Sequence, residues 1–399
     1  MAQPDREGNV GKQTQTVVIV GGAIIGSFAA YYLRKLGFDG QISVIEADPS
    51  YARSSTALSA ASIRTQFGCA INIHMSLFAA DLFRNITREF GADADIGFVE
   101  QGYLIIASEA QKAERQAAVR MQNAEGASIA ALSPDEARAR FPWLNASDIG
   151  LATYGLKNEG WFDAWSLLQL VRRAARDLGV NYVTGHVDAI EVQGTKATGV
   201  RMDDGTHVPA DWCINAAGPM AARIVRDIVP GFPVEPRKRT VFSLKTPLSG
   251  TGFPMLFDDS GAWIRPEGQG FIAGIAPAAD QDPDATGDFE PAHDLLEDVL
   301  WPALAHRVPV LEDLRVERSW AGHYEVNFLD HNAIIGPHDE IGNLVFMNGF
   351  SGHGVMHAPA AGRGIAEHIL TGQYRTLDLS PLGFERIRAG RKLHETVVY

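Results

Sequence analysis

Residues 16–33, TVVIVGGAIIGSFAAYYL, decide the fold of this chain. β-Branched residues fill positions 16–20 and end at a glycine, which predicts a strand buried on both faces. Apolar residues at helical spacing then run from Ile24 to Leu36 before another glycine, which predicts a helix. Gln41 to Ile45 is expected to be the next strand. These segments together predict a βαβ unit, the building block of a parallel sheet.

The turn between this strand and this helix has a glycine pattern that suits phosphate groups. Residues 21–26, GGAIIG, nearly match the sequence G-x-G-x-x-G. Backbone amides at the helix start can meet a pyrophosphate there, because glycines keep side chains away. Ala23 replaces the second glycine, and its methyl group narrows the space through which a pyrophosphate reaches these amides without closing it. Taken alone, the turn also fits simple packing of a strand against a helix.

Glu46 supplies the second feature of a dinucleotide site. It ends the second predicted strand, twenty residues after Gly26. An acid at this place can accept hydrogen bonds from both ribose hydroxyls, and it favours a ribose without a 2′-phosphate. We therefore expect a site for NAD or FAD.

The rest of the chain combines this pattern with a different one. From Val234 to Ile275, short extended segments separated by Gly and Pro predict an antiparallel sheet. Leu344 to Met347, a glycine-rich turn and a helix at 360–370 return to the first pattern. Other helices are expected at 70–90 and 164–178, a helix start at Ser133 to Glu136, strands at 102–107, 181–184 and 212–215, and a hairpin turn at Asp204-Gly205.

Composition and charge exclude several classes of partner. Lys and Arg number 35 against 48 Asp and Glu, a formal charge of -13, which repels nucleic acid and anionic membranes. Cys69 and Cys213 fit neither a disulfide framework nor a zinc site, so we expect no metal and a cytoplasmic location. The first residues lack the apolar stretch of a secretory signal, and 1–13 are expected to form a flexible tail.

Three later segments decide between NAD and FAD: residues 53–55 (RSS), 215–219 (NAAGP) and 349–354 (GFSGHG). With them the chain resembles the superfamily of D-amino-acid oxidase, glycine oxidase and sarcosine oxidase, which implies FAD. Small residues suit these places because backbone must come close to a large planar ligand. The resemblance implies these cofactor contacts: Gly21, Gly22, Ala23, Ile25, Gly26, Glu46, Ala47, Arg53, Ser54, Ser55, Val187, Ala216, Ala217, Gly218, Gly322, Gly349, Phe350, Ser351, Gly352, His353, Gly354 and Met356.

The chain is also similar to the FAD-dependent oxidoreductase domain-containing proteins linked to mitochondrial complex I assembly, and to their bacterial relatives. The matching strings are SIRTQF at 62–67, NIHMS at 72–76, WAGHY at 320–324 and DLSP at 378–381. This similarity implies a flavoprotein but leaves open whether it is an enzyme or an assembly factor.

Sarcosine oxidase supplies roles for residues that match its motifs. Arg64 falls on the arginine that holds the substrate carboxylate, a task for which the guanidinium fork is suited. Tyr324 falls on an active-site tyrosine, and His353 lies in the glycine-rich flavin loop. Trp263 and Arg265 lie where relatives project residues toward the flavin, and Arg265 is a candidate for a second carboxylate anchor.

Three residues differ from those of sarcosine oxidase, and they change what we expect for substrate binding, the flavin linkage and reoxidation. Met356 replaces the lysine that is the second carboxylate anchor. Gly322 replaces the cysteine that binds flavin covalently, so FAD should be noncovalent. Ile272 replaces the lysine that activates oxygen, which leaves oxygen and an electron carrier both open as reoxidant.

The predicted fold class is α/β with an α+β substrate part. A Rossmann-like FAD-binding domain is interleaved with an antiparallel-sheet substrate domain, since 399 residues are long for a single core. The boundaries that we expect are 14–95, 150–225 and 325–385 for the FAD-binding domain, and 96–149 and 226–324 for the substrate domain.

The expected function is FAD-dependent oxidation of the C–N bond of a small secondary amine or N-substituted amino acid, such as sarcosine, dimethylglycine or iminodiacetate. Two candidate arginines slightly favour a substrate with two carboxylates. A flavoprotein assembly factor and a nicotinamide-only dehydrogenase are the alternatives.

Each candidate residue also has a plainer interpretation. Arg64 fits a surface charge that precedes a helix, Arg265 fits a surface or domain-interface ion pair, and Tyr324 and Trp263 fit core aromatics. His353 fits a structural hydrogen bond, which is the favoured interpretation for His323. Glu159, Trp161 and Asp163 fit a strand end packed beside a helix cap.

Overall fold

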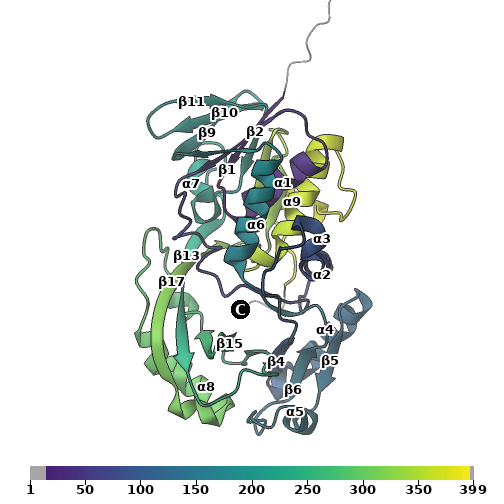
Figure 1. The fold of residues 1–399 in the computed structure, drawn as a ribbon, viewed down its shortest axis with the longest axis vertical. Coiled ribbons are helices and arrows are strands. Elements are labelled where there is room, and N and C mark those ends of the chain that lie inside the picture. The colour runs from purple at the N-terminus through teal and green to yellow at the C-terminus, as the bar shows by residue number, and fades with distance from the viewer. Residues whose placement is uncertain (1–14, 396–399) are drawn as a thin grey trace, which may run out of the picture.

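The computed structural model describes residues 15–395, so the predicted tail at 1–13 lies outside the described residues. Two layered parts face each other, with the helices α1, α6 and α9 in one and the strands β13, β15 and β17 in the other (Figure 1). The predicted mixed α/β fold class is confirmed. The first part is built on six strands in this order: β18 (Ile334–Pro337), β19 (Leu344–Asn348), β12 (Trp212–Asn215), β1 (Thr16–Val20), β2 (Gln41–Glu46) and β8 (Asn181–Thr184).

Five of these strands run parallel, since β8 also pairs in parallel with β2, and their carboxyl ends lie at one edge of the sheet. β1 lies between β2 and β12 and runs parallel to both, and β12 pairs in parallel with β19. Gly21, Glu46 and Ala216 therefore follow or end adjacent strands at the same edge. Ligands of open α/β sheets bind at such an edge.

Helices cover this sheet closely. α1 (Ile24–Lys35) is buried along most of its length and packs on α9 (Gly354–Thr371). Gly362 lets the two helices cross, because a Cβ at this position would lie 2.6 Å from the backbone carbon of Phe28. α6 (Ala164–Asp177) and α2 (Ala70–Arg84) complete this layer by packing on α1 and α9 respectively.

The second part is built on an eight-stranded, largely antiparallel sheet. Its longest pair, β13 with β17, runs antiparallel over twelve residues, and only β14 and β4 pair in parallel. The antiparallel sheet expected from Val234 to Ile275 is therefore present. The order is β17 (Arg315–Asn327), β13 (Val234–Lys245), β16 (Gly270–Gly274), β15 (Trp263–Glu267), β14 (Met255–Phe257), β4 (Tyr103–Ala107), β6 (Leu151–Gly155) and β5 (Ile129–Leu132).

Smaller elements link the two parts. β3 pairs with β7, and β9, β10 and β11 form a three-stranded sheet beside the first part. Their bounds, with those of the remaining helices, are β3 (Ser62–Ile63), β7 (Gly160–Trp161), β9 (Val187–Gln193), β10 (Lys196–Met202), β11 (His207–Pro209), α3 (Ile86–Phe90), α4 (Lys112–Ala124), α5 (Pro134–Arg140), α7 (Ala221–Ile224), α8 (Trp301–Arg307) and α10 (Glu385–Arg388).

Three local predictions from the sequence are confirmed. Ser133 and Glu136 form a capping box at the start of α5. Asp163 caps α6 by accepting hydrogen bonds from the amides of Trp165 and Ser166. The hairpin between β10 and β11 turns at Gly205, whose φ is +85°.

Three other predictions need correction. The helix expected at 70–90 breaks at Asn85, whose side-chain amide donates to the backbone oxygen of Asp81 and competes with the helix. The helix expected at 360–370 begins at Gly354 and accommodates Pro359 in its interior. β6 lies inside the stretch assigned to the FAD-binding domain, yet it pairs with β4 and β5 in the eight-stranded sheet.

Candidate active site

A cavity of about 550 Å³ opens at the carboxyl edge of the parallel strands. Its lining comes from the turn after β1, the end of β2, the turn after β12 and the loop before α9. Most of the predicted cofactor contacts lie on it: Gly21, Ala23, Ile25, Glu46, Ala47, Arg53, Ser54, Ser55, Val187, Ala216, Ala217, Gly218, Phe350, Gly352 and Gly354.

The glycines at the start of α1 are required by close backbone packing. Gly21 has a φ of +99°, and a Cβ there would lie 2.2 Å from the carbonyl oxygen of Ala216. A Cβ on Gly26 would lie 2.0 Å from the carbonyl oxygen of Gly21. Gly22 and Gly26 do not line the cavity, so they serve packing while Gly21 and Ala23 form the wall. This cradle fits a pyrophosphate at the helix start.

Glu46 lies where the predicted ribose acid should lie. Its carboxylate accepts hydrogen bonds from the amides of Gly22, at 2.7 Å, and Asp48, at 2.9 Å. These bonds fix the side chain at the end of β2 on the cavity wall. The geometry fits a carboxylate that receives ribose hydroxyls.

Ser55 adds a buried polar group that the protein leaves unsatisfied. Its hydroxyl is buried and has no hydrogen-bond partner within residues 15–395, and it lines both this cavity and a smaller one beside it. A buried polar atom without a partner is costly unless a ligand supplies one. The site therefore fits the predicted dinucleotide.

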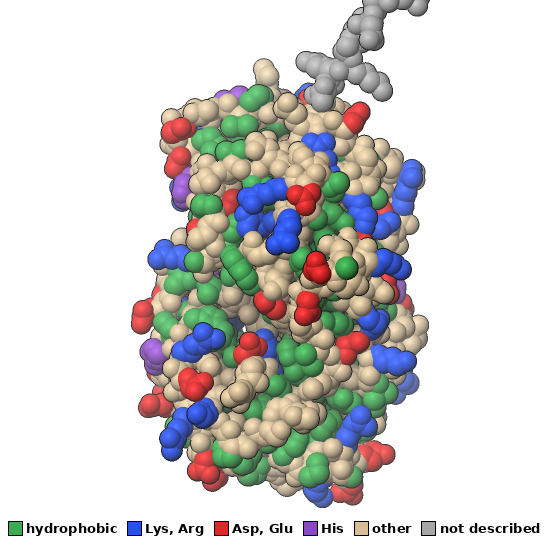
Figure 2. Space-filling view, in the orientation of Figure 1, with side chains coloured by type: hydrophobic (Ala, Val, Ile, Leu, Met, Phe, Trp, Pro, Cys, Tyr) green, Lys and Arg blue, Asp and Glu red, His purple; other side chains and the backbone are tan. Residues whose placement is uncertain are grey.

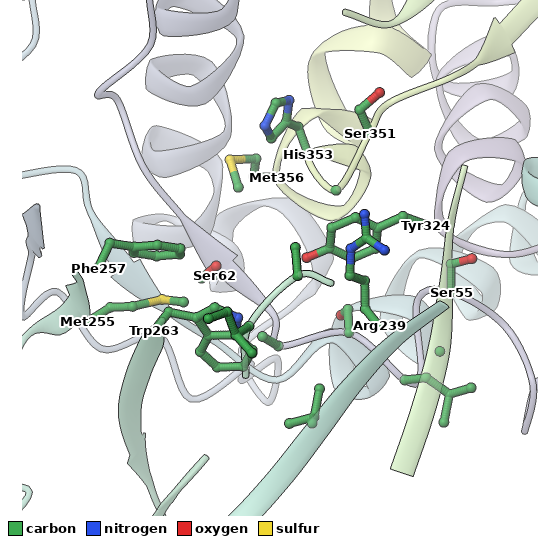
Figure 3. Close-up of a pocket in the computed structure, with 18 of the residues that line it drawn as sticks. Ser55, Ser62, Arg239, Met255, Phe257, Trp263, Tyr324, Ser351, His353 and Met356 are labelled. Atoms are coloured by element: carbon green, nitrogen blue, oxygen red, sulfur yellow. The ribbon is translucent and has the colours of Figure 1, made fainter. Parts of the chain in front are cut away.

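The smaller cavity has a volume of about 70 Å³ and shares Ser55, Tyr324 and Gly352 with the larger one. In Figure 3 the aromatic side chains of Phe257 and Trp263 lie across it from the loop that carries His353. It gathers most of the predicted substrate residues, namely Arg64, Trp263, Tyr324 and His353, and three further predicted cofactor contacts beside them: Gly322, Ser351 and Met356.

Arg64 is a deeply buried cation in the wall of the small cavity, with 3% of its surface exposed. Its guanidinium lies 3.9 Å from the centre of the Phe67 ring. Nη1 donates to the backbone oxygen of Gln66, and Nη2 contacts Nε2 of His353 at 3.1 Å. These contacts hold the guanidinium in place, which rules out the interpretation of Arg64 as a surface charge.

His353 is the partner that fixes this arrangement. A guanidinium has only donors, so Nε2 of His353 accepts and the ring hydrogen lies on Nδ1. Burial, with the neighbouring Arg64 charge, holds the pKa of His353 well below its usual range. The imidazole is therefore neutral.

The segment that carries Arg64 is anchored from behind by Glu159. This fully buried carboxylate accepts hydrogen bonds from the amide and hydroxyl of Thr65, at 2.7 and 2.8 Å, and from Nε2 of Gln66, at 3.0 Å. The amide of Tyr103 donates to it as well. Glu159 thus orders the approach to Arg64 without lining either cavity.

Tyr324 stands between the two cavities. A Cβ on Gly352, whose φ is +94°, would lie 2.5 Å from the Tyr324 ring, so only glycine lets the loop pass this closely. Burial raises the pKa of Tyr324, while the charges of Arg239 and Arg64 oppose that shift. The phenol therefore keeps its proton and can act as a hydrogen-bond donor.

Gly322 leaves no room for the covalent link that a cysteine would make in relatives. A Cβ there would lie 2.8 Å from Cβ of Leu58. Leu58 thus fills the space beside the strand, in agreement with noncovalent FAD.

The structure does not place Arg265 in the site. Its Nε donates to the backbone oxygen of Ala60 at 2.8 Å, and its Nη1 donates to Pro266 and to the carboxylate of Glu267. It lines neither cavity. Local acceptors use its guanidinium, so the prediction of a second carboxylate anchor at Arg265 is corrected. Gly349, another predicted contact, also lies outside both linings.

Arg239 and Glu325 are among the charged residues of the site that escaped the sequence analysis. Arg239 of β13 lines the small cavity, and its guanidinium lies 5.4 Å from the centre of the Tyr324 ring. Glu325 lines the large cavity, and burial raises its pKa to about 8 although the amides of Gly349 and Phe350 donate to it. The only feature of the sequence that could have pointed to Glu325 is that it directly follows Tyr324.

His323 lines both cavities, but its contacts support the structural interpretation. Its Nε2 lies 2.6 Å from the backbone oxygen of Asp288, and its ring stacks on Phe289 at 4.2 Å. Both contacts hold the segment after β16 against β17.

On the face shown in Figure 2, basic and acidic side chains are mostly interspersed, with one small group of basic side chains in its upper centre. Among the helices of residues 15–395, none is long and apolar enough to cross a membrane. In the same part of the chain, no group of three or more His, Cys, Asp or Glu side chains could hold a metal ion.

The chain matches known proteins over nearly its whole length. FAD-dependent oxidoreductase domain-containing protein 1 of Xenopus laevis is 39% identical, over 97% of this chain and 85% of its own. The structure of L-proline dehydrogenase from P.horikoshii superposes with a TM-score of 0.84 and 25% identity, covering 95% of this chain and 99% of that chain. Iminodiacetate oxidase from Chelativorans sp. BNC1 shares the fold, with a TM-score of 0.75, 21% identity and coverage of 92% and 98%. The DAO family of FAD dependent oxidoreductases matches residues 16–368. The chain therefore belongs to this family, and its cofactor is FAD.

Proposed function

We propose that this protein oxidises the C–N bond of a small secondary amine or N-substituted amino acid, of the sarcosine, dimethylglycine or iminodiacetate type. Oxidation would give an imine that water hydrolyses to an aldehyde or glyoxylate and a smaller amine. Oxygen and an electron carrier both remain candidates for the reoxidant. The names of the relatives in the proline dehydrogenase and iminodiacetate oxidase structures support an amino- or imino-acid substrate.

One observation carries this proposal: a buried guanidinium, that of Arg64, lines a small cavity directly beside the cofactor cavity. A buried cation in such a place favours an anionic ligand, and the planar fork suits a carboxylate. A substrate held there by its carboxylate would present the neighbouring carbon and nitrogen to the cofactor side. Positioning of this kind is the main contribution of a protein to cofactor chemistry.

The other residues of the small cavity have matching tasks. FAD, when bound, supplies the capacity to take up a hydride. His353 accepts a hydrogen bond from Arg64 and so holds its guanidinium in place. Because the imidazole is neutral, it does not cancel the positive charge that attracts a carboxylate. Tyr324 keeps its phenolic proton beside the space between the cavities, where it can donate to a substrate oxygen. Phe257 and Trp263 wall the cavity with apolar surface that excludes water.

An anaerobic screen tests the proposal. The yellow holoprotein is mixed with sarcosine, dimethylglycine, iminodiacetate, proline and glycine, and the flavin absorbance is followed. We expect bleaching by at least one secondary amine. If dithionite bleaches the flavin but no amine does, the flavin has a structural role, as in the assembly-factor alternative.

A further inference from the structure

Arg239 is a second cation of the small cavity, and the hydride chemistry proposed above does not require it. It lies on β13 directly opposite Gly322 of β17, next to Tyr324. Figure 3 shows its side chain extending from the strand toward the interior of the cavity, alongside Tyr324. A cation in this position needs an explanation in terms of the ligand.

The hydrogen bonds of Arg239 leave one edge of its guanidinium unused. Nη1 donates to the backbone oxygen of Lys238, at 2.8 Å, and to Oδ1 of Asp282, at 2.9 Å. Nη2 donates to Oδ2 of Asp282 at 2.8 Å. These bonds use three of the five N–H groups of a guanidinium. Nε is buried and has no acceptor within the described part of the chain.

The two remaining N–H groups, on Nε and Nη2, form the second fork of the guanidinium. Asp282 already takes the fork between Nη1 and Nη2. The other fork has the spacing that a carboxylate matches with two parallel hydrogen bonds. A buried donor without an acceptor is destabilising, so this edge is better satisfied when a ligand occupies it.

We propose that Arg239 is a specificity-determining residue that binds a second carboxylate of the substrate through this fork. The inference rests on the proposed function and narrows it: the substrate is an amine with an acidic group on each side of its nitrogen, like iminodiacetate. Arg64 then holds one carboxylate and Arg239 the other. Arg239 takes over the task that Arg265 cannot perform.

Asp282 sets the strength of this second subsite. It belongs to the segment between β16 and α8, and its carboxylate neutralises Arg239 while fixing the plane of the guanidinium. A second carboxylate at the other fork is attracted by Arg239 but repelled by Asp282. Removal of the Asp282 charge should therefore strengthen binding of a diacid and leave a monoacid unaffected.

A matched pair of unreactive ligands tests the inference in the holoenzyme. Diglycolate has the shape of iminodiacetate with an ether oxygen in place of the nitrogen, and methoxyacetate has the shape of sarcosine. Neither is an amine, so binding is measured without turnover, by perturbation of the flavin absorbance and by titration calorimetry. We expect diglycolate to bind at least about tenfold more tightly than methoxyacetate.

Two variants assign the difference to Arg239. Arg239→Gln should lower diglycolate affinity by about tenfold or more and change methoxyacetate affinity by less than about twofold. Asp282→Asn, which keeps an acceptor on the end fork, should raise diglycolate affinity by roughly threefold or more, with methoxyacetate unchanged. Arg237→Gln is the control, because Arg237 lies two residues away on the same strand and lines neither cavity.

Several results would overturn the inference. They are the absence of diglycolate binding and equal affinity of the wild type for diglycolate and methoxyacetate. An equal loss of affinity for the two ligands in Arg239→Gln, or no gain of diglycolate affinity in Asp282→Asn, would overturn it as well. The last variant keeps the test decisive if Arg239→Gln does not fold. If the diacid preference is found but no amine bleaches the flavin, the proposed oxidation fails while the role of Arg239 stands.

Discussion

Nη2 of Arg64 donates a hydrogen bond to Nε2 of His353 over 3.1 Å, and this bond ties the loop after β3 to the residue that directly precedes α9. The two residues are 289 positions apart in the chain. The substrate side of the site is thus fixed directly to the loop on its cofactor side.

This contact makes Arg64 the most informative position for substitution. Arg64→Lys keeps a charge but loses the fork, and Arg64→Ala loses both, so substrate binding should weaken in that order. Truncation of a buried charge partner costs about 2 to 5 kcal/mol, so Arg64→Ala should slow flavin reduction at limiting substrate by more than about tenfold. Stopped-flow absorbance measures the rate, and Arg84→Ala, which removes a surface ion pair with Glu100, is the control. Unchanged rates in both Arg64 variants would make this residue purely structural.

Glu46→Gln should weaken FAD binding by about 1.5 to 3 kcal/mol, because a charge-assisted hydrogen bond to ribose becomes a neutral one. The measurement is the FAD dissociation constant of the reconstituted apoprotein. Asp39→Asn removes an exposed acid from the loop before β2 and should have no effect. A wild-type dissociation constant in Glu46→Gln would mean that another group holds the ribose.

Acid precipitation should release all of the yellow colour into the supernatant. Leu58 occupies the space beside Gly322, so this position offers no covalent link to flavin. The absorbance of the pellet and the supernatant decides the point. Colour that stays with the washed pellet would reveal a covalent bond at another residue.

Glu325 should make the folded protein less stable as the pH rises from about 4.5 to about 8. Burial raises its pKa from the ordinary 4.5 to about 8, so the folded protein holds this proton more tightly than the unfolded chain. The resulting stabilisation is complete below pH 4.5 and is lost as the pH rises through 8. Urea unfolding at pH 6 and pH 9 should show a loss on the order of 1 to 3 kcal/mol in wild type and a smaller loss in Glu325→Gln. Equal losses in the two proteins would show that Glu325 is ionised throughout.

The sequence predicted the parts of this protein that depend on local pattern. The βαβ unit, the position of Glu46 and the caps at Ser133 and Asp163 follow from residue types at fixed spacing, and the structure has each of them. The cofactor segments around Ser55 and Gly352 were identified by resemblance, and they do lie together on the cavity walls.

The remaining features depend on pairing between distant segments. Arg239 lies opposite Gly322 only because β13 pairs with β17 in one register, which no spacing within either segment reveals. Arg265 was expected to face the site because relatives project residues toward the flavin at this place. The acceptors that hold it, Ala60 and Glu267, come partly from a loop some two hundred positions away. The sequence thus predicts toward which face of a strand a polar side chain points, but it does not predict which group that side chain binds.

The walls of the large cavity come from segments that lie far apart in the chain, which has a consequence for biosynthesis. Gly21 and Glu46 are synthesised before Ala216, and Phe350 and Gly354 are synthesised after it. β12 also lacks one of its two neighbours until β19 has been synthesised. Because the ribosome adds residues from the amino end, the pocket stays open on one side until β19 and the loop before α9 have been synthesised. Stable FAD binding should therefore require synthesis of β19, and nascent chains that stop before β19 should carry no flavin.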